Sequence, residues 1–250
     1  MKEPPRTNTL DINVDLGEGG ENDAELITLA GSVNIACGGH AGNKYTMRAA
    51  ITEALRRNVA IGAHPGYEDR LHFGRRPLAL PAGETRKMLT HQIRQFHTLC
   101  AESGAKLHHV KPHGALYNQA DQNSDLAKEI CASIRDVVVG PVILYGPPSG
   151  HLEKESLLFG ITFCPEGFVD RRYLADGRLM PRSHPEAVIK NLSEVVAQAR
   201  ELALNHRVAV ATGGWLPLRV NTLCIHGDGV EAIEILRAIR SMLQASHSLR

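Results

Sequence analysis

Aromatic residues are scarce in this 250-residue sequence: Phe, Trp and Tyr make up 4% of it, with a single tryptophan. The formal net charge is +1, and the basic residues form no cluster. Nucleic-acid binding draws on clustered Lys and Arg and on stacking aromatics, so the composition argues against such a partner. No apolar run approaches the roughly 20 residues of a membrane span. The polar start, residues 1–8, lacks the apolar core of a signal peptide, and we expect a cytoplasmic protein without membrane attachment.

Several familiar motifs are also missing. The five cysteines are dispersed without CxxC spacing, so reduced thiols are expected rather than a zinc ribbon or a disulfide framework. Cys37, Cys164 and Cys224 follow apolar residues and are interpreted as small buried hydrophobic side chains. The sequence holds no GxSxG elbow, no P-loop and no GxGxxG after its first predicted strand. Serine-hydrolase and common nucleotide-binding signatures are therefore absent.

The order of predicted elements is a βα unit repeated about seven times with short connections. Residues 11–16 alternate and predict a strand with Ile12, Val14 and Leu16 pointing inward, and residues 207–211 and 215–220 predict a hairpin. Such repetition predicts a parallel sheet covered by helices, and this length favours a single TIM-like (β/α) barrel, seven-stranded, over residues 9–250. Residues 1–8 read as a flexible tail, and a doubly wound open sheet is the alternative fold.

Polar residues follow nearly every predicted strand. Active sites of βα barrels are built at the carboxyl ends of their strands, so these groups are expected to share one mouth. In chain order they are Asn13, Asp15, Glu18, Asn34, His40, His64, Tyr67, Lys111, His113, Tyr117, Glu166, Asp170, Arg171, His226 and Asp228.

The chemistry of this set is restricted. Carboxylate and imidazole groups suit a divalent metal that activates water, with Asp15, His40, His64 and His113 as candidate ligands. Without a metal the same groups supply general acids and bases. Lys111 and Arg171 suit a substrate carboxylate or a developing oxyanion. The structural alternatives are turn capping for Asp15 and a loop ion pair for Asp170 with Arg171.

Taken together, the motifs resemble those of the LamB/YcsF family, to which the A component of 5-oxoprolinase belongs. The resemblance covers about residues 10–245 in the family's order. It rests on the segments 11–18 (DINVDLGE), 34–42 (NIACGGHAG), 61–67 (IGAHPGY), 73–76 (FGRR), 108–118 (HHVKPHGALYN), 166–173 (EGFVDRRY), 180–183 (MPRS) and 224–228 (CIHGD). The sequence departs from the family's usual pattern at Gly39, where an aromatic residue is usual, and at Gly229 and Val230.

The resemblance implies a glycoside hydrolase/deacetylase-like barrel and ATP-dependent hydrolysis of 5-oxo-L-proline to L-glutamate. It implies that the protein acts in a complex with 5-oxoprolinase subunits B and C and that the complex uses ATP with magnesium. Whether the chain also forms a homo-oligomer does not follow from the sequence. On this basis we expect catalytic roles for Asp15, His64, Lys111 and His113. The expected substrate-binding residues are Asn13, Glu18, His40, Tyr117, Glu166, Asp170, Arg171, His226 and Asp228.

Two other functions stay open at this point. A metal-dependent deacetylase or amidohydrolase acting alone on a sugar or amide would use the same strand-end carboxylates and imidazoles. A non-enzymatic protein would only deliver the lactam to partner subunits. Stoichiometric zinc with ATP-independent hydrolysis would mark the first of these, and substrate binding without any rate loss on mutation would mark the second.

Overall fold

The computed structural model of the chain describes residues 10–227 and 231–247. The predicted tail, residues 1–8, and the predicted site residue Asp228 lie outside these ranges. Within them, seven parallel strands close into a barrel in the order β1-β2-β3-β4-β5-β6-β9, with β9 paired to β1. The strands are β1 (Asp11–Leu16), β2 (Ser32–Ala36), β3 (Ala60–His64), β4 (His109–Val110), β5 (Ile143–Gly146), β6 (Thr162–Phe168) and β9 (Thr222–His226). The expected seven-stranded TIM-like barrel is confirmed, and the open sheet is excluded.

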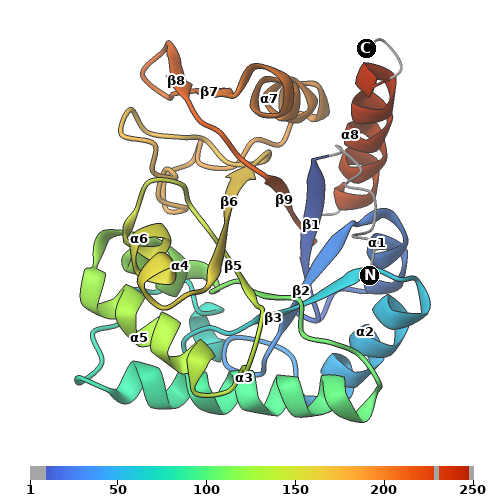
Figure 1. Cartoon of the computed structure of the whole chain (residues 1–250). Coiled ribbons are helices and arrows are strands. Elements are labelled where there is room, and N and C mark those ends of the chain that lie inside the picture. Colours follow the sequence, from blue (N-terminus) through green and yellow to red (C-terminus); the bar gives the residue numbers. More distant parts are fainter. Residues whose placement is uncertain (1–9, 228–230, 248–250) are drawn as a thin grey trace.

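Helices surround the barrel on its outside (Figure 1). They are α1 (Asp23–Leu29), α2 (Lys44–Arg56), α3 (Glu84–Glu102), α4 (Gly114–Gln122), α5 (Ser124–Arg135), α6 (His151–Leu158), α7 (Leu192–Asn205) and α8 (Ala232–His247), with the short 3-10 helix η1 (Arg70–His72). Sequence signals fix several starts: the Asn43 side chain accepts from the backbone N–H groups of Tyr45 and Thr46 and caps α2. None of the described helices combines the length and the apolar character needed to cross a membrane.

The two faces of β1 have opposite characters, and one expectation about them is wrong. Ile12, Val14 and Leu16 belong to the apolar core between the barrel and its helices, where Val14 lies beside Leu26 of α1. Asn13 and Asp15 point into the barrel, because both contact Lys111 from across it. The interior of a βα barrel is commonly packed with bulky apolar side chains. In this protein the apolar side of β1 instead packs in the core between the strands and the helices, and its polar side chains lie inside the barrel.

The chain passes from β4 into α4 within a few residues. His113 directly precedes the helix, which begins at Gly114 and takes Tyr117 into its first turn. Gly114 has φ +54, and a Cβ there would lie 2.7 Å from the carbonyl oxygen of Gly74. A glycine is therefore required for the chain to turn from β4 into α4 this close to the 73–76 loop. This turn places Lys111 and His113 at the barrel mouth.

A long connection, residues 169–221, separates β6 from β9. It contains α7 and the predicted hairpin, which is confirmed as the antiparallel pair β7 (Arg207–Ala209) and β8 (Trp215–Pro217). Figure 1 shows α7, β7 and β8 together at one end of the barrel, beyond β6 and β9. This connection supplies part of the wall of the cavity described next.

Candidate active site

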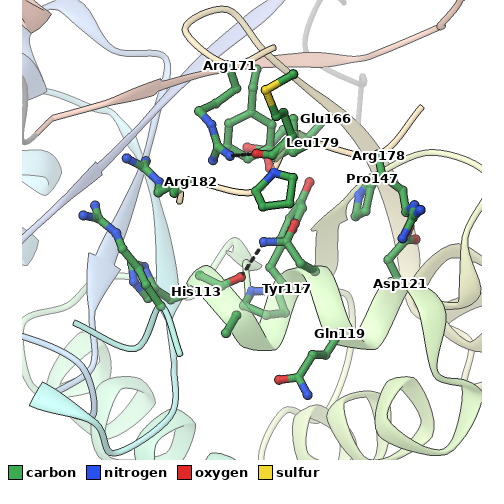
Figure 2. Close-up of a pocket in the computed structure, with 18 of the residues that line it drawn as sticks. His113, Tyr117, Gln119, Asp121, Pro147, Glu166, Arg171, Arg178, Leu179 and Arg182 are labelled. Atoms are coloured by element: carbon green, nitrogen blue, oxygen red, sulfur yellow. Dashed lines mark hydrogen bonds between the residues drawn. The ribbon is translucent and has the colours of Figure 1, made fainter. Parts of the chain in front are cut away.

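A cavity of about 510 Å³ lies at the carboxyl ends of the strands (Figure 2). Small-molecule sites commonly have this size and position. It is lined by side chains from most of the strand ends and by residues 171–183 of the long connection. Eight of the predicted site residues lie in its wall: Asp15, His64, Lys111, His113, Tyr117, Glu166, Arg171 and His226.

The ammonium of Lys111 lies at the floor of this cavity and is 1% exposed. Its Nζ is 2.8 Å from Asp15 Oδ1 and 2.9 Å from Glu166 Oε1, in two buried ion pairs. Nζ also lies 3.3 Å from Asn13 Oδ1 and 3.0 Å from Cys224 Sγ. A buried cation without such partners would be strongly destabilising, so the two carboxylates and the lysine hold one another in place.

The two carboxylates that share Lys111 differ in their acidity. Burial would raise the pKa of Asp15, but the Lys111 ammonium, with His64 and His226, holds that pKa far below its ordinary value. Burial raises the pKa of Glu166, and Lys111 only partly opposes this. Burial would lower the pKa of Lys111, but the carboxylates keep it well above its ordinary value. The site thus combines an ionised carboxylate, an ammonium and a carboxyl suited to hold a proton, a common arrangement for acid–base work.

A histidine–aspartate pair forms another part of the site. His226, the last residue of β9, places Nδ1 2.7 Å from Oδ2 of Asp170. Burial would raise the pKa of Asp170, but the His226 ring, with Arg182 and Arg171, lowers it. An ionised carboxylate at Nδ1 fixes the proton on that nitrogen, and the other ring nitrogen is then left as a base. His226 lines the cavity, so this base is available to a bound molecule.

Three histidines and a glutamate meet at the side of the cavity. Glu18 Oε1 lies 3.0 Å from His40 Nε2, 3.3 Å from His113 Nδ1 and 3.8 Å from His64 Nε2. The rings of His40 and His113 are stacked, with centroids 3.6 Å apart. Burial lowers the pKa of His40 to about 3 and of His64 to about 4, and it lowers that of His113 well below the ordinary value. Neutral imidazoles are therefore favoured at neutral pH.

Some predicted site residues support the wall from behind. Asn13 is fully buried in the barrel, where it donates to Thr222 and accepts from Asn34. Asn34 also donates to Asp15. Glu18 and His40 contact each other beside the cavity, and Asp170 contacts the cavity residue His226. Tyr67 is buried against the 73–78 loop, where its hydroxyl lies 3.4 Å from the carbonyl of Leu78. Three cysteines were expected to be buried. Cys37 and Cys224 are buried, whereas Cys164 is partly exposed.

Further charged residues line the cavity that sequence reasoning did not assign to the site. They are Arg75, Arg178 and Arg182, with Asp121 from α4. In Figure 2 Arg171 and Arg182 lie on one side of the pocket and Arg178 and Asp121 on the other. Arg75 belongs to the family motif FGRR and Arg182 to the family motif MPRS, so the sequence motifs could have indicated both as site residues. Arg178 and Asp121 carried no such signal, because they come to the pocket from an ordinary loop and a helix end.

Fold and site together define a parallel βα-barrel protein with a charged ligand cavity at the carboxyl ends of its seven strands. The chain belongs to the LamB/YcsF family, whose model matches residues 10–249. It is similar to the crystal structure of a lactam utilization protein from Thermus thermophilus, with 34% sequence identity and a TM-score of 0.88. That match covers 96% of this chain and 97% of the other. The family resemblance expected from the sequence motifs is confirmed.

Proposed function

We propose that this protein is the component of a 5-oxoprolinase that opens the ring of 5-oxo-L-proline to give L-glutamate, in an ATP-dependent reaction with subunits B and C. Family membership and the similar lactam utilization protein support a lactam as substrate. The observation that carries the proposal is Lys111, which stands between Asp15 and Glu166 at the cavity floor. A cation can stabilise the developing oxyanion of amide hydrolysis, and two carboxyls of different acidity can serve as its general base and general acid.

The cavity wall suits a small anionic lactam. Arg171 is 4% exposed, and its Nε and Nη2 donate to the carbonyls of Ala187 and Met180, which hold the guanidinium in a fixed position. Arg182 and Arg75 line the same cavity. Arginine binds carboxylate and phosphoryl oxygens with paired donors, so this wall is the proposed position for the substrate carboxylate and for phosphoryl oxygens.

The proposed chemistry starts from the low reactivity of a lactam. Transfer of the ATP γ-phosphoryl group to the lactam oxygen, with magnesium on the nucleotide, converts that oxygen into a leaving group. A water molecule then attacks the ring carbon and passes a proton to Asp15 or to a histidine of the site. The ring C–N bond then breaks as the nitrogen takes up protons, one of them from Glu166, and the former ring carbon is left as an acyl phosphate. A second water molecule attacks that carbonyl carbon, the bond from carbon to the phosphorylated oxygen breaks, and glutamate and inorganic phosphate are released.

A second candidate is a metal-dependent amidohydrolase or deacetylase that acts without ATP. The observation that favours it is the group formed by Glu18, His40, His64 and His113, whose side chains have the donor atoms of a zinc site. In such an enzyme the metal would polarise the amide carbonyl, and no phosphoryl transfer would be needed.

One assay separates these functions. Purified protein is incubated with 5-oxo-L-proline, with and without ATP–magnesium and with and without subunits B and C, and glutamate is measured. Glutamate that requires ATP and both partners supports the proposal. Zinc-dependent hydrolysis by the chain alone supports the amidohydrolase. If Asp15→Asn and His113→Asn both leave the reconstituted rate unchanged, the chain contributes binding only and the catalytic assignment is wrong.

A further inference from the structure

Four side chains from four successive strand ends form a compact group, here called the His–Glu cluster. Glu18 follows β1, His40 follows β2, His64 ends β3 and His113 follows β4. Their ligand-type atoms all lie within 4.8 Å of one another. The three histidines are 1–4% exposed, so water competes little for these atoms.

Backbone carbonyls determine where the protons of two of these rings lie. His64 Nδ1 is 2.8 Å from the carbonyl oxygen of Lys111, and His113 Nε2 is 2.9 Å from that of Phe73. A carbonyl oxygen only accepts, so both of these nitrogens carry a hydrogen. In neutral rings the other nitrogens, His64 Nε2 and His113 Nδ1, are then bare lone pairs, and they face each other at 2.9 Å. Two lone pairs at this distance repel unless a cation lies between or beside them.

The spacing of the four donor atoms matches a tetrahedral metal centre. With metal–ligand bonds of about 2.0–2.1 Å, tetrahedral donors stand about 3.3 Å apart. Four of the six separations between donor atoms in the His–Glu cluster are 2.9, 3.0, 3.3 and 3.8 Å, and the other two are within 4.8 Å. Histidine ligands are also usually held by a hydrogen bond from the outer ring nitrogen, as at His64 and His113.

A neighbouring group provides an internal comparison. Asp15, Cys224 and His226 also have their ligand-type atoms within 4.8 Å of one another. There, however, the Lys111 ammonium supplies the positive charge, 2.8 Å from Asp15 and 3.0 Å from Cys224. In the His–Glu cluster the donor atoms instead contact one another directly.

We propose that Glu18, His40, His64 and His113 bind one divalent transition-metal ion of the zinc class. Three imidazole nitrogens and one carboxylate oxygen suit zinc or cobalt, whereas magnesium and calcium prefer oxygen ligands alone. Asp15, which the sequence suggests as a ligand in place of Glu18, lies beside the site: its Oδ2 is 3.5 Å from His64 Nε2 while Oδ1 binds Lys111. This inference does not depend on the reaction proposed above.

The test measures metal binding directly. The full chain is stripped with a chelator, dialysed and loaded with Zn²⁺ or Co²⁺, and bound metal is counted by elemental analysis. We expect one equivalent per chain, the visible absorption of tetrahedral Co²⁺, and a higher unfolding temperature with metal than without. His64→Gln and His113→Gln should lose the equivalent and the absorption. His226→Gln is the matched control, because it alters the neighbouring group only, and it should keep both.

Contrary outcomes are equally definite. Less than a tenth of an equivalent in the loaded wild-type protein overturns the site, and a proton shared by His64 and His113 then balances the two lone pairs. Equal metal content in wild type, His64→Gln and His113→Gln also overturns it.

If circular dichroism shows that the histidine variants do not fold, Glu18→Gln replaces them, since it keeps all three imidazoles. That variant should bind Zn²⁺ at least about tenfold more weakly, and unchanged affinity overturns the site. None of these readouts requires ATP or partner subunits, so failure here is distinguishable from failure of the oxoprolinase assay.

Discussion

The Nζ atom of Lys111 lies 2.8 Å from Oδ1 of Asp15, and the two residues come from opposite sides of the barrel interior, 96 positions apart in the chain. Asp15 ends in the barrel because β1 turns its polar face inward, and Lys111 reaches it from the end of β4. Both side chains are buried. This pair is therefore a part of the fold as well as the centre of the proposed site.

Lys111→Met tests both roles of that pair. Removing the ammonium leaves the carboxyls of Asp15 and Glu166 buried without their cation, and we expect a loss of about 3–5 kcal/mol in unfolding free energy. Glutamate release in the reconstituted assay should fall at least about a hundredfold. Urea unfolding and the glutamate assay measure the two effects. Lys106→Met, on the exposed side of the chain before β4, is the matched control and should change neither. A fully active Lys111→Met enzyme would remove Lys111 from the catalytic assignment.

Glu166→Gln separates proton transfer from stability. Burial raises the pKa of Glu166, so its contribution to stability is present below its unfolded pKa and is lost as pH rises through the folded pKa. The amide has the same shape and no such charge, so the variant should be at least as stable as wild type above that range. Its rate should fall about 10²-fold or more, because it carries no transferable proton. A rate loss that only follows a loss of folded protein would contradict this role.

His226→Asn should lower kcat with little effect on folding. The variant keeps a polar side chain near Asp170 but loses the ring nitrogen that faces the cavity, and a loss of about 10²-fold is expected. The surface pair His72–Asp69 has nearly the same geometry, with Nδ1 2.8 Å from the carboxylate, so His72→Asn is the matched control. Initial rates over a range of substrate concentrations separate kcat from KM. An effect on KM alone would leave His226 as a binding residue.

As the pH falls, the metal-free protein should lose stability already above the pH at which ordinary carboxylates take up protons. Burial lowers the pKa of His64 to about 4, below the ordinary 6.5, so the unfolded chain binds its proton first as pH falls. Stability from this group is thus full above pH 6.5 and declines toward pH 4, by about 2 kcal/mol at pH 5. Urea unfolding at pH 7 and pH 5 measures the difference. His64→Gln should show a smaller pH effect than wild type, and an equal effect would rule out His64 as its source.

Gly39→Ala should weaken the wall behind the His–Glu cluster. A Cβ at Gly39 would lie 2.6 Å from both Gln92 Nε2 and the carbonyl oxygen of Gly66. Those two atoms are joined by a 2.8 Å hydrogen bond that holds the loop after β3. We expect a loss of about 1–3 kcal/mol in a thermal or urea unfolding experiment. Gly20→Ala is the control, since a Cβ there meets its nearest atom, Asp23 Oδ1, at 3.4 Å. Equal stability of both variants would show that the Gln92 side chain moves freely.

The βα order, the barrel and most of the cavity wall could be predicted because they depend on local patterns. Alternation in residues 11–16, glycine and proline after each strand, and polar groups at the same relative place in successive units are all visible in the chain. Closure then brings the strand ends together whatever the details of packing. The family motifs point to the same residues, and the family match over residues 10–249 agrees with them.

Other features could not be predicted, because they arise only when distant segments meet. The carboxylate that contacts His40 and His113 is that of Glu18 and not that of Asp15, and this depends on how far each side chain reaches across the mouth. The helix that starts at Gly114 depends on its close approach to Gly74, which a local pattern does not contain. Arg178 and Asp121 enter the pocket from surface-type segments for the same reason.

The order of residues along the chain was enough to place polar groups of a given kind, including Lys111 and His113, at one end of a βα barrel. The partners of these groups follow from the folded arrangement alone. It joins Lys111 to Asp15 and Glu166, His226 to Asp170, and the bare nitrogens of His64 and His113 to each other. The physical reason is that strand order follows local periodicity, whereas partnership among buried charges is set by distances of a few ångströms across a closed interior.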